Sequence, residues 1–111
     1  LAKAYRYFER SNDDNFDQQT SNGVTLVDFY ADWCGPCKRM APTLDSLASR
    51  VAGQASIAKV NVDHSPNLSS RFGVRGIPMF VVMKDGQVMN KSTGSKSEQE
   101  LLDLLDLGGD K

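Results

Sequence analysis

Apolar and polar residues follow one another along the chain in patterns that predict alternating strands and helices. Residues 24–30 are almost continuously apolar and rich in β-formers, which is typical of a strand covered on both faces. Before them, weaker patterns predict a short strand over 4–8, a brief helix over 12–20 and a turn at 21–23. We therefore expect residues 24–30 to form a central strand of a partly parallel sheet.

A long amphipathic pattern follows this strand and predicts a helix from Cys34 to about Val51. Its apolar positions recur at helical spacing: Met40, Leu44, Leu47, Ala48 and Val51. Pro42 lies inside the pattern, and proline removes one backbone hydrogen bond, so we expect a kink near it within a single helix. Gly53 is expected to end the helix.

The second half of the chain predicts a strand, a short helix or turn, and a β-hairpin. The strand covers residues 57–62 and the short helix or turn lies within 63–72. Two further strand patterns, 79–83 and 87–91, flank Asp85-Gly86, which is a strong hairpin signal.

The last predicted helix begins at a capping-box pattern, with Ser95 at its start and Glu98 three residues later. It ends at Gly108-Gly109, and its apolar face carries Leu101, Leu104 and Leu105. The complete order is β-α-β-α-β-α-β-β-α, which indicates an α/β fold with helices on both faces of a mixed sheet. With 111 residues and no repeat or linker, we expect one domain over 1–111.

Composition and charge exclude several classes of partner. The net charge of −1 provides no field to attract phosphate backbones, so neither nucleic-acid binding nor membrane-surface binding is expected. No stretch approaches the length of a membrane span, and residues 1–10 lack an apolar signal core. We expect a cytoplasmic monomer, or an organelle-matrix protein if a targeting segment precedes Leu1.

Two cysteines, Cys34 and Cys37, lie in the run Trp33-Cys34-Gly35-Pro36-Cys37 directly after the central strand. This spacing favours a dithiol that cycles between reduced and oxidised forms, since a helical turn brings the two sulfurs together. Such a pair suits a reducing compartment, where cysteines serve chemistry rather than scaffolding.

Three other interpretations of this pair are open. A structural zinc site normally needs four ligands, and the chain adds one distant histidine, His64, which lies in a polar turn. No metal site is therefore expected. A purely structural disulfide would close so small a ring that it would stabilise the fold by only about 2 kcal/mol. Two unrelated free thiols fit poorly beside a Gly-Pro turn and an indole.

The two thiols are expected to have different roles. Cys34 would lie at the N-terminus of a helix, where free N–H groups favour the thiolate, and Cys37, one turn further, would be more buried. This makes Cys34 the attacking sulfur and Cys37 the resolving one. Pro36 fits the first helical turn because its missing N–H has no partner to lose.

Asp28 and Lys59 are charged residues inside apolar strand patterns. A buried Asp28 would stay protonated more readily than a free one, which suits a proton carrier, whereas on an edge strand it would face solvent. Lys59 could direct its ammonium toward Asp28, although such a lysine more often reaches water. Pro78, after Ile77, fits a turn or strand start, and the pattern alone does not favour a cis bond.

These residues resemble the thioredoxin family along most of the chain. The resemblance rests on 27–32 before the WCGPC box, Lys38 and Pro42 after it, 58–63, 73–78, and Gly94. It implies the five-stranded thioredoxin fold, a redox-active Cys34–Cys37 disulfide and reduction of disulfides in other proteins. It also implies that Asp28 is the buried acid serving Cys37, Lys59 its electrostatic neighbour, and Pro78 a cis-proline beside the dithiol.

The resemblance further implies a substrate-docking surface and a partner. The docking surface comprises Trp33, Gly35, Pro36, Gly76, Ile77, Pro78 and Gly94, with the Ile77 backbone pairing to the incoming chain as an added strand. The resemblance also implies that the dithiol is reduced again by a flavin-dependent thioredoxin reductase that uses NADPH, with no cofactor expected on the chain itself. The Gly-Pro dipeptide between the cysteines favours a reductase over an oxidase. A redox-independent protein-binding module is the alternative function.

Two positions depart from the family's pattern. Met79 stands where a small residue usually follows the proline, and Thr93 stands where an apolar residue commonly precedes the glycine. Both are expected at the docking surface, where they would change partner preference and leave the thiol chemistry intact.

Overall fold

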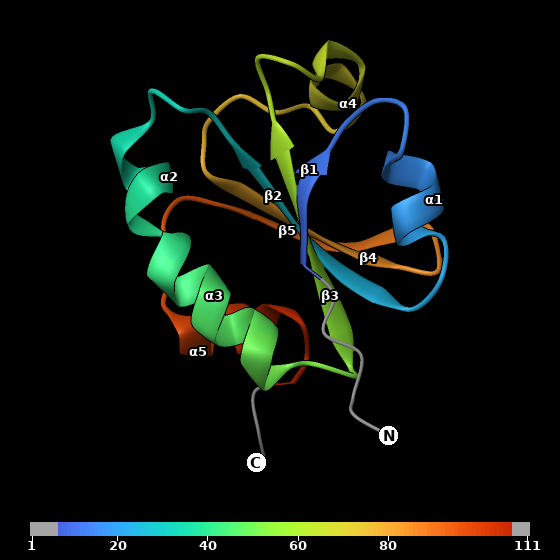
Figure 1. The fold of residues 1–111 in the computed structure, drawn as a ribbon, viewed down its shortest axis with the longest axis vertical. Coiled ribbons are helices and arrows are strands. Elements are labelled where there is room, and N and C mark those ends of the chain that lie inside the picture. The colour runs from blue at the N-terminus through green and yellow to red at the C-terminus, as the bar shows by residue number, and fades with distance from the viewer. Residues whose placement is uncertain (1–6, 108–111) are drawn as a thin grey trace.

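A five-stranded mixed sheet forms the centre of the molecule (Figure 1). The structure is a computed structural model and describes residues 7–107. The strand order is β1-β3-β2-β4-β5, with β1, β2 and β3 parallel and β4 and β5 antiparallel. The strands are β1 (Tyr7–Ser11), β2 (Val24–Tyr30), β3 (Ala55–Asn61), β4 (Met79–Lys84) and β5 (Gln87–Thr93). The predicted central position of residues 24–30 is confirmed.

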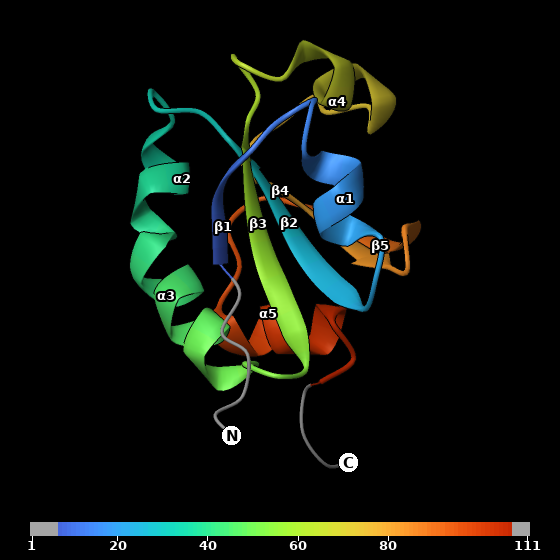
Figure 2. The ribbon, with the colours of Figure 1, turned by 45° about the vertical axis from the view of Figure 1, so that its right-hand side comes forward.

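Helices cover both faces of the sheet, as predicted, and the described residues contain five of them. They are α1 (Phe16–Thr20), α2 (Gly35–Arg39), α3 (Ala41–Arg50), α4 (Pro66–Arg71) and α5 (Glu98–Leu104). Figures 1 and 2 show α2, α3 and α5 on one face and α1 and α4 on the other. Neighbouring residues of β2 divide between these layers: Leu26 packs with α3 and α5, and Val27 packs with α1 and α4. Both are fully buried, which explains the continuous apolar run.

The strand expected at residues 4–8 is present at Tyr7–Ser11 and ends three residues later than predicted. Residues 4–6 of the prediction lie outside the described part of the chain. The hairpin is confirmed, with Asp85 and Gly86 at positive φ angles of 50° and 83° in its turn.

The single kinked helix expected from Cys34 to Val51 is wrong. The chain forms two helices, α2 and α3, with Met40 between them. The Met40 N–H donates to the carbonyl oxygen of Cys37, three residues back, which tightens the end of α2. Pro42 has no N–H to continue the helical ladder from α2, so α3 begins anew with proline in its first turn.

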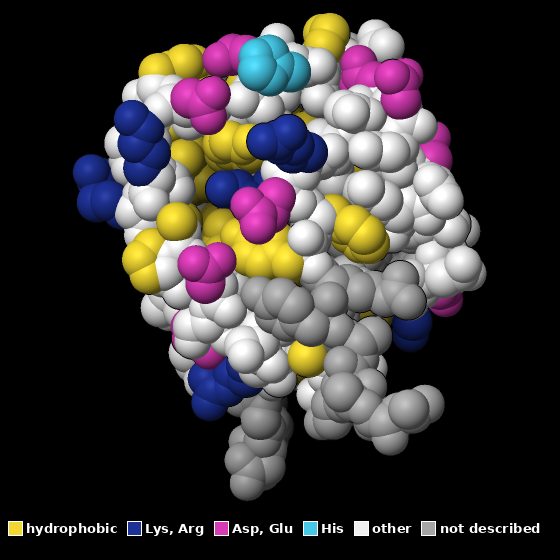
Figure 3. Space-filling view, viewed as in Figure 1, with side chains coloured by type: hydrophobic (Ala, Val, Ile, Leu, Met, Phe, Trp, Pro, Cys, Tyr) yellow, Lys and Arg dark blue, Asp and Glu magenta, His cyan; other side chains and the backbone are white. Residues whose placement is uncertain are grey.

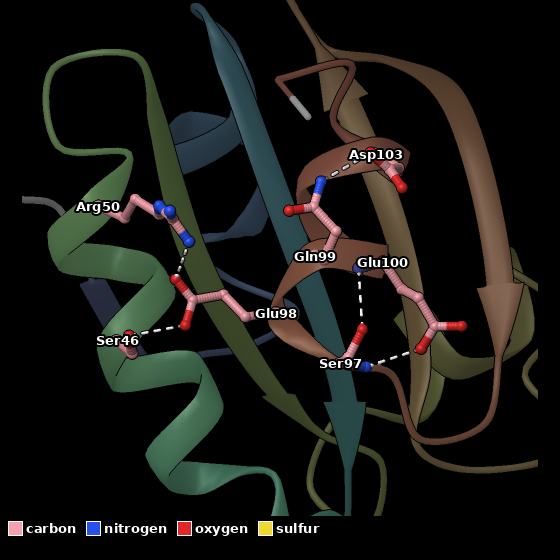
Figure 4. A network of polar contacts seen from close by, with 7 residues as sticks. All are labelled: Ser46, Arg50, Ser97, Glu98, Gln99, Glu100 and Asp103. Atoms are coloured by element: carbon pink, nitrogen blue, oxygen red, sulfur yellow. Dashed lines mark hydrogen bonds and ion pairs between the residues drawn. The ribbon is translucent and has the colours of Figure 1, made fainter. Parts of the chain in front are cut away.

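The capping box of α5 lies two residues later than predicted. The Ser97 hydroxyl accepts the Glu100 N–H at 3.1 Å, and a Glu100 carboxylate oxygen accepts the Ser97 N–H at 2.8 Å (Figure 4). Glu98 instead reaches α3, where it accepts from Ser46 at 2.7 Å and from Arg50 at 3.0 Å. Both spacings fit the pattern, and the contact with α3 decides between them. The predicted stop at Gly108-Gly109 lies outside the described residues.

Replacing Ser97 should destabilise the protein, whereas replacing Ser95 should not. Ser97→Ala removes the acceptor for the first turn of α5 and is expected to lower the free energy of unfolding by about 1 kcal/mol. Urea unfolding of Ser97→Ala and of Ser95→Ala, the matched control, measures the difference. A larger loss in Ser95→Ala would show that the predicted cap is the one in use.

Candidate active site

The two cysteines meet where β2 leads into α2. Cys34 is the N-cap of α2, its Sγ is bonded to the Sγ of Cys37, and their Cα atoms are 5.2 Å apart. The Cys37 N–H donates to Cys34 Sγ at 3.2 Å. A donor aimed at one sulfur favours negative charge there, so this contact distinguishes Cys34 as the better thiolate.

The expected difference in burial between the two sulfurs is absent in this oxidised form. Cys34 is 5% exposed and Cys37 is 4% exposed. Both pack in a small apolar cluster with Ala31, against Tyr30 and Ile77. What separates the cysteines is therefore the hydrogen bond on Cys34 rather than their exposure.

Asp28 is buried in the middle of β2, and the edge-strand alternative is wrong. It is 1% exposed, and neither carboxylate oxygen has a hydrogen-bond partner within residues 7–107. Asp28 lies two residues from Leu26 and from Tyr30, so its side chain is on the same face of the sheet as theirs. This is the face that carries α2 and α3. Burial raises the pKa of Asp28 to about 7, partly opposed by the charge of Lys59. An acid with such a pKa can accept a proton near neutral pH.

Lys59 lies beside Asp28 but does not bury its charge against it. The two residues are partners in the parallel pair β2–β3. The Lys59 Nζ lies 4.4 Å from the centroid of the Tyr30 ring, a cation–π contact. A cavity of about 520 Å³ opens there, lined in part by Lys59, Tyr30, Asp32 and Ser65. Lys59 thus keeps contact with solvent while its charge still acts on Asp28.

The Ile77–Pro78 peptide bond is cis and lies next to the dithiol. The Ile77 carbonyl oxygen is 3.9 Å from Cys34 Sγ. Behind it, the Gly94 N–H donates to the Pro78 carbonyl oxygen at 2.8 Å, and Gly94 adopts a φ of 102°, which favours glycine. The cis bond, which the resemblance implied and the local pattern did not favour, is present.

The predicted docking residues surround the dithiol: Trp33, Gly76, Ile77, Pro78 and Gly94, with Gly35 and Pro36 on α2. Trp33 is 69% exposed, and its indole N–H donates to an Asp63 carboxylate oxygen at 2.9 Å. A Cβ on Gly76 would lie 3.3 Å from the Thr93 methyl carbon, so a larger residue would crowd this surface. The structure therefore gathers the predicted site residues at one end of the sheet.

Asp63 is a site residue that sequence reasoning missed. It follows β3, and Trp33 follows β2, which is the parallel neighbour of β3. Parallel strands end at the same edge of a sheet, so the positions of Trp33 and Asp63 just after two such strands could have predicted that the two residues lie close together.

Met79 does not lie at the docking surface. It is 4% exposed and packs between β2 and α4 in the cluster that contains Val27, Phe29 and Phe72. Residues of a strand alternate between faces, and Met79 follows Pro78 onto the buried side. Thr93, in contrast, is exposed and adjoins Gly76, as expected.

Other features of the described residues lie outside this site. Within residues 7–107, no cluster of three or more His, Cys, Asp or Glu side chains could hold a metal ion, and no helix is long and apolar enough to cross a membrane. His64 is exposed. A larger cavity of about 590 Å³ is lined by Gly23, Val24 and Ala55, at the opposite end of β2 and β3 from the dithiol.

Comparisons with known proteins agree with this geometry. The family model described as Thioredoxin matches residues 8–107. Thioredoxin of Staphylococcus haemolyticus is 45% identical over 94 residues, which cover 85% of this chain and 90% of that protein. Thioredoxin of Staphylococcus aureus is 44% identical over 94 residues, which again cover 85% of this chain and 90% of that protein. The structure of a mutant thioredoxin from Halobacterium salinarum NRC-1 aligns with a TM-score of 0.85 at 34% identity, covering 100% of this chain and 97% of that one.

Proposed function

The chain belongs to the thioredoxin family and is a protein-disulfide reductase, and on that premise we propose that Cys34 attacks the target while Cys37 completes the reduction. The observation that supports these two roles is the hydrogen bond that the Cys37 N–H donates to Cys34 Sγ at 3.2 Å. This donor favours the Cys34 thiolate, and only a thiolate attacks a disulfide.

The reaction proceeds in two exchanges. The Cys34 thiolate forms a bond to one sulfur of the target disulfide, and the other target sulfur leaves as a thiolate and takes up a proton. Cys37 then loses its proton and attacks Cys34 Sγ, which releases the second target sulfur. The target gains two electrons, and the Cys34–Cys37 pair becomes the disulfide seen in the structure.

Asp28 is proposed as the group that accepts the Cys37 proton. A pKa of about 7 leaves much of the Asp28 population ionised at neutral pH. Lys59 is proposed to act through Asp28, because its charge opposes the rise of that pKa. Cys34, Cys37 and Asp28 all belong to one chain, so we propose that a monomer is active.

The oxidised pair must be reduced again for a second turnover. We propose that a flavin-dependent thioredoxin reductase supplies two electrons from NADPH and that the chain itself binds no cofactor. This would place the protein in electron transport that serves cell redox homeostasis. A chain with two cysteines, both in one dithiol, suits the cytoplasm.

Coupled insulin reduction tests the proposed partner and direction. With NADPH, a bacterial thioredoxin reductase and insulin, the chain should support continuous NADPH oxidation, and omitting the chain should stop it. If dithiothreitol sustains insulin reduction but NADPH and the reductase do not, the proposed partner is wrong. A potential more oxidising than about −200 mV would contradict the direction, since that range belongs to isomerases.

The exposed Trp33 favours a second candidate, a redox-independent docking role. The double variant Cys34→Ser, Cys37→Ser distinguishes the two. A cellular role that survives without the dithiol indicates docking, whereas its loss together with insulin reduction indicates the reductase.

A further inference from the structure

Basic side chains outnumber acidic ones around the dithiol. Lys38 and Arg39 lie on α2, Arg75 directly precedes Gly76, and Lys96 lies two residues after Gly94. Figure 3 shows Lys and Arg side chains gathered over α2, at the left of the molecule. Asp32, Asp63 and Glu100 are the acidic residues beside these segments that form no ion pair within the described part of the chain, and Glu98 is paired with Arg50. Four basic groups therefore face three such acids here, an excess of one positive charge, although the whole chain carries a net charge of −1.

Two of these basic groups are held against the docking surface by their contacts. The Lys96 Nζ donates to the carbonyl oxygens of Thr93 and Gly94 at 2.9 and 3.2 Å. An Arg39 guanidinium nitrogen lies 3.4 Å from where a Cβ on Gly35 would be, between the two cysteines. Both charges therefore adjoin residues expected to touch the substrate.

Among the described residues, no carboxylate forms an ion pair with the four basic groups. Between residues 7 and 107 the ion pairs are Arg50–Glu98 and Arg71–Asp17, and neither includes them. Hydrogen bonds from Ser97 and, to a smaller extent, the charge of Lys96 lower the pKa of Glu100, whose carboxylate already caps α5. The hydrogen-bond partners of Lys96 are neutral carbonyl groups, so its charge is offset only in part, by Glu100, and can still attract a ligand.

We propose that this surface, comprising Lys38, Arg39, Arg75 and Lys96, selects protein disulfides whose cysteines are flanked by acidic residues. The inference rests on the proposed function and adds a substrate preference to it. Arg75 lies two residues before Ile77, and Lys96 binds the carbonyl oxygen of Gly94, whose N–H donates to Pro78, so a chain that pairs with the Ile77 backbone would lie near both basic residues. Acidic side chains beside its cysteine meet positive charge on both sides, which speeds encounter and favours the docked state.

Three synthetic peptides test the preference, each with the same type of disulfide at the same position. Their cysteine is flanked by Asp and Glu, by Ser and Gln, or by Lys and Arg, and each rate is divided by the rate of reduction by dithiothreitol. At about 0.01 M salt, kcat/KM for the acidic peptide should exceed that for the basic peptide about tenfold, and about 1 M salt should abolish the difference. Equal ratios at low salt would overturn the inference. Reduction of the neutral peptide tests the reductase function separately.

Charge reversal locates the preference on the molecule. The double variant Arg75→Glu, Lys96→Glu should prefer the basic peptide, and Lys96→Glu alone should show a reduced preference for the acidic one. Lys84→Glu is the control, since Lys84 is exposed at the far end of β4 from Pro78 and the substitution changes the net charge by the same step. If Lys84→Glu lowers the preference as much as Lys96→Glu does, overall charge rather than this surface is responsible, and the inference is wrong.

Discussion

Cys37→Ser should convert the protein into a trap for its targets, whereas Cys34→Ser should be inert. Without the resolving thiol, the mixed disulfide between Cys34 and a target sulfur cannot be released, so it accumulates. Without Cys34, the thiolate that receives the Cys37 N–H is lost, and insulin reduction should fall at least about 1000-fold.

Non-reducing electrophoresis and mass spectrometry of cell extract passed over each variant measure this difference. Cys37→Ser should yield adducts that dithiothreitol releases, and the double variant Cys34→Ser, Cys37→Ser is the control for non-covalent capture. Adducts that form on Cys37 in Cys34→Ser as readily as on Cys34 in Cys37→Ser would show that the assigned roles are wrong.

Asp28→Asn should stabilise the oxidised protein by an amount that depends on pH. The pKa of Asp28 is about 7 in the folded protein, against an ordinary value of 3.8. Between about pH 4 and 7 the unfolded chain releases this proton while the folded protein keeps it, so stability falls as the pH rises through this window. Above about pH 7 the full effect is reached, and the free energy of unfolding is lower by about 4 kcal/mol than at low pH. The asparagine amide is a neutral group of the same shape, so the variant should not show this loss.

Urea unfolding at about pH 3 and pH 8 tests the expectation. The wild type and Asp28→Asn should have similar free energies of unfolding at the lower pH, and the variant should be more stable at the higher one. Asp32→Asn, a change at an exposed carboxylate two residues from the dithiol, is the matched control. Equal free energies of unfolding for Asp28→Asn and the wild type at pH 8 would mean that burial of Asp28 does not raise its pKa.

Local sequence predicted the elements of this fold because their signals lie within a few residues of one another. The nearly continuous apolar run 24–30, rich in β-formers, favours a strand buried on both faces, and Asp85-Gly86 supplies the turn between two strand patterns. The Cys34–Cys37 spacing likewise fits a helical turn and determines that the sulfurs can bond. These predictions needed no knowledge of which elements pack together.

Contacts between distant segments decided the remaining features. Ser95 and Ser97 fit the capping pattern equally, and the bonds from Ser46 and Arg50 to Glu98 select Ser97. Trp33 donates to Asp63 only because β2 and β3 end at one edge.

What the sequence determined by itself is the chemistry of the dithiol and, apart from the division of 35–50 into two helices, the order of strands and helices, since both depend on neighbouring residues. The tertiary structure decided which groups surround that dithiol. Packing buries Met79, a hydrophobic residue, under α4. It also buries Asp28, an acid, and leaves both of its carboxylate oxygens without a hydrogen-bond partner in the described residues. Burial depends on what the opposite layer covers, and a strand pattern does not contain that information.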